Sequence, residues 1–261
     1  MEPQVQYAKT SDGVNIAYWT MGEAGRWVVL VPSLGRGGAD FDQLGQVLRA
    51  AGFRVLAFDP RGVGESRASL DDLTLHDLSA DVALLIEQLD ETPVHVVGHA
   101  YGNRVARCLA ADRPDLVRTV TLLAAGGLIP PDDQVSASGA RCFQLGLPEV
   151  ERLEDIRLAF FAAKSDPSVW LDGWWPAAAA AQVAAGRATL LDDWWTAGKA
   201  PLLVIQGIDD RLAIPANGHA LKEQLGTRVR VVDLPDAGHA LLPEQPEAIA
   251  SEIVTFLKEL D

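Results

Sequence analysis

Cysteine is scarce in this sequence: only Cys108 and Cys142 occur among 261 residues. Two thiols are too few for the disulfide framework of a small secreted domain, and the apolar helical pattern around Cys108 is typical of a buried side chain. The first 13 residues show no basic segment followed by an apolar one, and no apolar run reaches the ~18 residues of a membrane span. We therefore expect a cytoplasmic protein with no membrane partner.

Basic residues are also scarce, because 22 Lys and Arg stand against 36 Asp and Glu, for a formal net charge of −14. A nucleic-acid-binding surface needs clustered Lys and Arg to neutralise phosphates, so we expect no nucleic-acid partner. Hydrophobic residues make up 48% and charged residues 22% of the chain, which is typical of a folded globular protein.

The sequence has no recognisable pattern for a metal or a nucleotide cofactor. No group of His, Cys and carboxylate residues has metal-ligand spacing. The glycines of segment 35–38 (GRGG) do not stand in the strand–turn–helix context of a dinucleotide fingerprint. We expect no metal, no cofactor and a small-molecule substrate.

Apolar strands alternate with amphipathic helices along most of the chain. A hairpin is expected at 5–22 around the turn TSDG, followed by strands at 27–32, 54–59, 93–99, 117–125, 201–207 and 228–235. This alternation predicts a mostly parallel sheet with helices on both faces. Residues 128–200 break the alternation, because they contain no convincing strand and five of the 7 tryptophans. We interpret that segment as a helical insertion.

The segment GHAYGN, residues 98–103, stands where an apolar strand gives way to a helix. In that context G-x-S-x-G forms a nucleophile elbow, whose central residue sits at the tip of a strained turn. Here the central residue is Ala100. Downstream, Asp210 follows the strand at 201–207, and His239 lies in the loop after the strand at 228–235. Elbow, acid and histidine in this order resemble the α/β-hydrolase superfamily.

The resemblance extends over nearly the whole chain and implies an α/β-hydrolase fold, with residues 1–127 and 201–261 as the core and 128–200 as a helical cap. It implies that Asp210, rather than the adjacent Asp209, orients His239 as the catalytic base. It also implies that the amides of Leu34 and Tyr101 form the oxyanion hole. Candidate substrate-binding residues are Ser33, His99, Trp174, Trp175, Trp194 and Trp195, which suit an apolar or aromatic substrate.

Alanine at position 100 departs from the superfamily pattern, because it has no oxygen with which to form an acyl-enzyme. Two explanations are open. Either a serine has been replaced in an enzyme that hydrolyses a small ester or lactone, or Ala100 is natural. In the second case His239 and Asp210 serve a cofactor-independent lyase, oxygenase or hydrolase without a covalent intermediate. A catalytically dead ligand-binding protein is a third alternative, which the retained acid and base disfavour. The oligomeric state is left open between monomer and homodimer.

Overall fold

A single eight-stranded sheet lies at the centre of the computed structural model, which describes residues 4–9 and 13–260. The strand order is β1-β2-β4-β3-β5-β6-β7-β8. Strands β1 and β2 form the predicted antiparallel hairpin, β2 also pairs antiparallel with β4, and the remaining pairs are parallel. The strands span Gln6–Lys9, Asn15–Met21, Trp27–Val31, Arg54–Phe58, Val94–His99, Val117–Leu123, Leu202–Gly207 and Val229–Leu234. The prediction of a mostly parallel sheet is confirmed.

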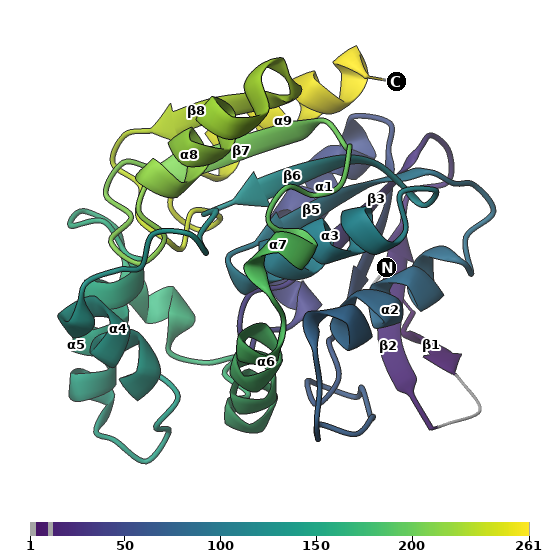
Figure 1. Ribbon diagram of the computed structural model, residues 1–261. Coiled ribbons are helices and arrows are strands. Elements are labelled where there is room, and N and C mark those ends of the chain that lie inside the picture. Colours follow the sequence, from purple (N-terminus) through teal and green to yellow (C-terminus); the bar gives the residue numbers. More distant parts are fainter. Residues whose placement is uncertain (1–3, 10–12, 261) are drawn as a thin grey trace.

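Helices cover both faces of this sheet (Figure 1). On one face α1 (Asp42–Ala50) and α9 (Pro246–Glu259) bury their apolar sides against the strands. On the other face lie α2 (Leu75–Ile86), α3 (Tyr101–Asp112) and α8 (Ala216–Leu225). Short 3₁₀ turns span Gly38–Phe41 and Gly226–Arg228. Continuous apolar strands follow from this arrangement, because a strand covered on both faces has no side exposed to water.

The segment between β6 and β7 contains helices and no strand, as predicted: α4 (Asp133–Arg141), α5 (Glu149–Phe160), a 3₁₀ turn (Pro167–Trp170), α6 (Pro176–Ala188) and α7 (Leu191–Trp194). It divides into two parts (Figure 1). Helices α4 and α5 and the 3₁₀ turn form an apolar cluster of their own. Helix α7 instead packs on α3, where Trp194 and Trp195 join the main core. The end of the segment is therefore part of the core layer, and a cap over all of 128–200 stays a prediction.

No helix within residues 4–9 and 13–260 is both long enough and apolar enough to cross a membrane.

Candidate active site

The turn between β5 and α3 has the geometry of a nucleophile elbow. Ala100 adopts φ 50° and ψ −109°, a left-handed conformation that costs a non-glycine residue ~1–3 kcal/mol. A Cβ at Gly98 would lie 2.6 Å from the Asn103 Cα, and one at Gly102 would lie 2.2 Å from the Val31 carbonyl oxygen. Both glycines are therefore needed for the close approach of strand and helix. The elbow keeps its strained backbone although its central side chain is a methyl group.

Asp210 and His239 form a buried pair beside the elbow. The Nδ1 atom of His239 lies 3.0 Å from Oδ2 of Asp210. The other carboxylate oxygen accepts hydrogen bonds from the backbone N–H groups of Leu212 (2.8 Å) and Ala213 (2.7 Å). Since the carboxylate fixes the Nδ1 proton, the neutral ring keeps Nε2 as its acceptor nitrogen. The structure thus brings the predicted acid and base together, whereas the side chain of Asp209 is exposed.

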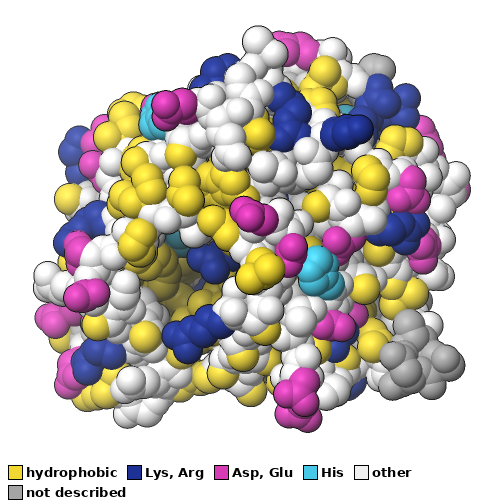
Figure 2. All heavy atoms as spheres, viewed as in Figure 1, with side chains coloured by type: hydrophobic (Ala, Val, Ile, Leu, Met, Phe, Trp, Pro, Cys, Tyr) yellow, Lys and Arg dark blue, Asp and Glu magenta, His cyan; other side chains and the backbone are white. Residues whose placement is uncertain are grey.

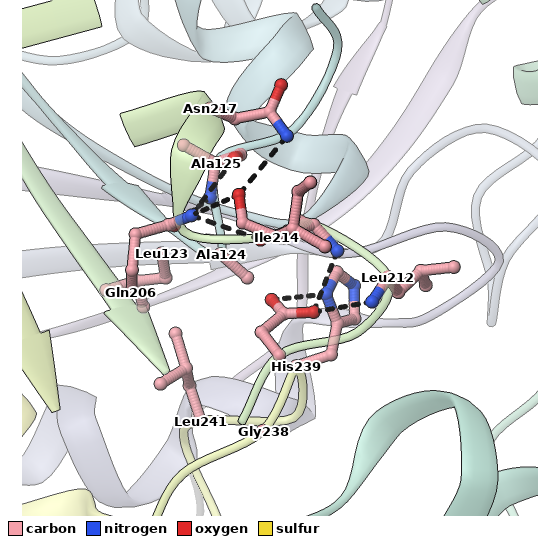
Figure 3. Close-up of polar contacts among 12 residues, drawn as sticks. Leu123, Ala124, Ala125, Gln206, Leu212, Ile214, Asn217, Gly238, His239 and Leu241 are labelled. Atoms are coloured by element: carbon pink, nitrogen blue, oxygen red, sulfur yellow. Dashed lines mark hydrogen bonds and ion pairs between the residues drawn. The ribbon is translucent and has the colours of Figure 1, made fainter. Parts of the chain in front are cut away.

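Three polar side chains hold the loops that carry this pair. Glu244 accepts hydrogen bonds from the amides of Gly238 (3.0 Å) and Leu241 (2.9 Å), on either side of His239. Gln206 binds the backbone of Ala125 and the loop after Asp210, and Asn217 binds the same loop (Figure 3). None of the three was predicted from the sequence. Gln206 could have been found as the polar residue within the apolar strand LLVIQG.

His99 lies behind the pair and does not line the cavity. Its Nε2–H donates to the backbone carbonyl of His239 at 2.9 Å, and its ring lies 6.0 Å from that of Trp170. Burial, together with the neighbouring His239 ring, lowers the pKa of His99 to about 4. The expectation that His99 contacts substrate is therefore not supported by its position, because its donor is used to hold the His239 loop.

The predicted oxyanion amides belong to the start of α3 and to the loop after β3. Among the described residues, the Leu34 and Tyr101 N–H groups have no hydrogen-bond acceptor. The loop is fixed to α6 by Gln182, whose Oε1 accepts from the amide of Gly35 at 2.7 Å and whose carbonyl accepts from the Tyr101 hydroxyl. Ser33 is buried and lines the cavity next to these groups. Two free amides beside the elbow suit an anionic oxygen.

A cavity of about 1050 Å³ opens above Ala100 and His239. Figure 2 shows the hollow, with hydrophobic side chains over much of its wall. Of the four predicted tryptophans only Trp174 lines it, in one aromatic wall with Phe143, Phe160 and Trp170, whose ring centroids lie 4.9–5.9 Å from that of Trp174.

The other three tryptophans do not reach the cavity. Trp175 follows Trp174 and points outward, with 40% of its surface exposed. Trp194 and Trp195 are buried in the core beside α3, and the Trp195 indole donates to Gln224 at 2.7 Å. The prediction that these three bind substrate is not supported by their positions, because adjacent residues project in different directions and α7 packs on α3.

One group of potential metal ligands lies away from the cavity, on α2 and α3. Donor atoms of His76, Cys108 and Asp112 lie within 4.8 Å of one another. Asp112 Oδ2 already contacts His76 Nδ1 (2.8 Å) and accepts from the Ser79 hydroxyl (3.0 Å), and burial raises the pKa of the Cys108 thiol to about 12. A metal would need the thiolate, so this group fits a hydrogen-bonded contact between two helices.

Comparison with known proteins agrees with this geometry. Residues 28–252 match the model of the alpha/beta hydrolase family. The chain is 30% identical over 260 residues to "Putative non-heme bromoperoxidase BpoC" of Mycobacterium tuberculosis, covering 93% of this chain and 97% of that protein. The crystal structure of BpoC superposes with a TM-score of 0.80, at 28% identity and 95% and 97% coverage of the two chains.

Two further proteins resemble the chain. A hydrolase from Pseudomonas aeruginosa has a TM-score of 0.81 and 26% identity, over 98% of this chain and 99% of its own. "Putative carbamate hydrolase RutD" of Variovorax paradoxus is 37% identical over 125 residues, which is 47% of this chain and 44% of that protein. The family match spans most of the sheet and both loops of the acid–base pair, and the chain therefore belongs to the alpha/beta hydrolase family.

Proposed function

We propose that this chain hydrolyses a small carbonyl compound (an ester, a lactone or a carbamate) by direct attack of water, with His239 as general base and no acyl-enzyme. The observation that carries the proposal is the buried His239–Asp210 pair beside an elbow without a nucleophile. The relatives named as hydrolases support a carbonyl substrate. The aromatic wall of the cavity supports an apolar or aromatic group next to the carbonyl.

The chemistry follows from the two nitrogens of His239. Nε2 takes a proton from a water molecule while the water oxygen bonds to the carbonyl carbon, and Asp210 stabilises the imidazolium that forms. The carbonyl electron pair moves to its oxygen, where the amides of Leu34 and Tyr101 stabilise the charge. The electron pair then returns, the bond to the leaving oxygen or nitrogen breaks, and His239 returns the proton to that atom. The products are the acid and the alcohol or amine.

The second candidate is an esterase that carries serine at position 100. The strained backbone of Ala100 favours it, because a left-handed elbow residue is the conformation that presents a nucleophile. In that enzyme His239 would take the proton of the serine hydroxyl rather than that of water. A pure binding protein is disfavoured, because both carboxylate oxygens of Asp210 are used to orient His239. One contacts the His239 ring, and the other accepts from the Leu212 and Ala213 amides, which fixes the carboxylate.

The test compares the chain with Ala100→Ser and His239→Ala on 4-nitrophenyl acetate. The direct mechanism predicts steady turnover without a pre-steady-state burst in the unchanged chain, and loss of at least ~100-fold in His239→Ala. The serine variant is expected to show a burst equal to the enzyme concentration if the acyl-enzyme then forms.

Two results would decide against the proposal. If the unchanged chain is inactive and Ala100→Ser alone hydrolyses the ester, the serine esterase is correct. If His239→Ala retains the activity of the unchanged chain, His239 is not the base. Circular dichroism of each variant checks that the fold is intact.

A further inference from the structure

The cavity has an unusual charge for so acidic a chain. Among the described residues that line it, none is Asp or Glu, and three are arginines: Arg36, Arg104 and Arg187. Lys and Arg side chains are visible inside the hollow and at its lower edge (Figure 2). The formal net charge of the whole chain is −14, so composition does not explain this local excess of positive charge. It arises because the fold places arginines, and no carboxylates, at the cavity wall. The cavity is therefore suited to an anion.

Arg36 is neutralised within the protein. Its Nε and Nη2 atoms donate to the two carboxylate oxygens of Asp40 at 2.8 and 2.7 Å, and Nη1 donates to the carbonyl of Asp172 at 2.8 Å. The guanidinium also stacks on Trp170 and Trp174, 4.7 and 4.9 Å from their ring centroids. Its donors are used in a bidentate pair, so Arg36 forms a fixed part of the wall.

Arg104 differs, because it has no acceptor among the described residues. It extends from α3, with its Cζ atom 5.8 Å from the Tyr101 ring centroid and 5.6 Å from that of Trp194. Within the described part of the chain it makes no hydrogen bond and no ion pair. Burial lowers the pKa of Arg104, and the neighbouring Arg107 carries a second buried positive charge. Arg107 donates through Nε and Nη2 to carbonyl oxygens of Asn103 and Gly126, although its Nη1 has no partner. Arg104 is thus the cation on this helix that makes no hydrogen bond to a described residue.

We propose that Arg104 binds a carboxylate of the substrate, whose reacting carbonyl lies at Ala100 and His239. No described residue neutralises this half-buried guanidinium, and a carboxylate in the cavity would accept two parallel hydrogen bonds from it. Of the two lining arginines that lack an acceptor in the described chain, Arg187 is exposed at the edge and Arg104 is half-buried beside two aromatic rings. One half-buried cation matches a monoanion better than a phosphate dianion. The position of the reacting carbonyl in this inference rests on the proposed function. The carboxylate site at Arg104 does not depend on it.

The cavity relates this carboxylate site to the reacting carbonyl, because Ala100, Arg104 and His239 line the same space. The carboxylate and the carbonyl therefore belong to the two ends of one small molecule, a half-ester of a short dicarboxylic acid. Arg187, exposed at the cavity edge, is placed to attract the anion on entry.

The test is a binding measurement that needs no turnover. 4-Phenylbutyrate, its neutral carboxamide and 3-phenylpropylphosphonate are titrated into the full chain, with calorimetry as the readout. The carboxylate is expected to bind about 10-fold to 100-fold more tightly than the carboxamide, from the strength of charge-assisted hydrogen bonds. Equal binding of acid and amide would overturn the proposal, and tighter binding of the phosphonate would overturn the assignment to a carboxylate.

Variants assign the preference to one side chain. Arg104→Gln is expected to abolish the preference for the acid, and Arg104→Lys to reduce it. The matched control is Arg49→Gln, which removes the same charge from the exposed side of α1, on the opposite face of the sheet. A preference that survives in Arg104→Gln refutes the role of Arg104. If that variant does not fold, the lysine variant and the acid–amide comparison in the unchanged chain still decide.

Hydrolysis of mono-4-nitrophenyl glutarate and of its methyl ester separates this inference from the proposed function. Arg104→Gln is expected to lower kcat/KM for the free acid by the factor seen in binding, and to lower it for the methyl ester by much less. If neither compound is hydrolysed but the carboxylate still binds through Arg104, the direct mechanism fails and the carboxylate site stands. If both are hydrolysed at equal rates and bind equally, the carboxylate site fails and the mechanism stands.

Discussion

Protonation of His99 should destabilise the fold at mildly acidic pH. Its pKa is about 4 in the folded chain, where burial disfavours the cation, against ~6.5 in an unfolded chain. Above pH 6.5 both states hold a neutral ring and the residue contributes no pH dependence. Between pH 6.5 and 4 only the unfolded chain binds the proton, so the free energy of unfolding falls as the pH falls.

The size of the effect follows from the two pKa values. When the pH falls from 7.5 to 5.5, proton uptake by His99 in the unfolded chain lowers the free energy of unfolding by about 1.3 kcal/mol. The full difference between the two pKa values of His99 corresponds to roughly 3 kcal/mol. In His99→Gln the new side chain can still donate to the His239 carbonyl but cannot titrate. The free energy of unfolding of this variant, relative to that of the unchanged chain, should therefore rise by ~1.3 kcal/mol as the pH falls from 7.5 to 5.5.

The assay is urea unfolding of both proteins at pH 7.5, 6.5, 6.0 and 5.5, at constant ionic strength. The series ends above the range in which the carboxylates of this acidic chain protonate. If the free energy of unfolding changes with pH by the same amount in both proteins, the reasoning is refuted. A His99 ring resonance that titrates with a midpoint near 6.5 in the folded protein would refute it independently.

Three other predictions test the site and its supports. Gly102→Ala places a methyl group 2.2 Å from the Val31 carbonyl oxygen, and calorimetry should show a loss of at least ~1–3 kcal/mol and a lower Tm. Glu244→Gln weakens two charge-assisted hydrogen bonds around His239, so kcat should fall while urea unfolding shows a loss of about 1–3 kcal/mol. The Asp112 hydrogen bond raises the pKa of His76, so its contribution to stability is present below pH ~6.5 and lost as the pH rises through the folded-state pKa. His76→Gln should therefore destabilise the chain at pH 6 more than at pH 9, measured by thermal unfolding.

The strands and the elbow were predictable because their signals are local. Strand β3 is buried at every position, and a strand covered on both faces reads as a continuous apolar run. The elbow depends on residues that are neighbours in the sequence, since Gly98 and Gly102 bracket the turn that they permit. The acid and the base were found through their order along the chain and their loops after strands, although they lie 29 residues apart.

The wall of the cavity was not predictable in the same way. Trp174 and Trp194 occupy similar dipeptides in the sequence, yet one lines the cavity and the other packs under α3. Which ring reaches the cavity depends on how α5, α6 and α7 pack, and that is decided by contacts between distant segments. Arg104 presented the same difficulty, because a helix pattern shows which face is polar but not whether water or a cavity meets it.

The positive cavity and the negative chain are compatible because they act over different distances. At physiological ionic strength the field of exposed carboxylates is screened within ~8 Å, so it has little influence on a group enclosed in the cavity. Inside the cavity the effective dielectric constant is lower than in water, which strengthens the attraction between a guanidinium and a carboxylate. Net charge therefore argues against a nucleic-acid surface but has no bearing on the charge of the substrate. The side chains that line the site determine that charge. Two of its arginines have no acceptor in the described chain, and of these Arg104 is the half-buried one, whereas Arg187 is exposed at the edge.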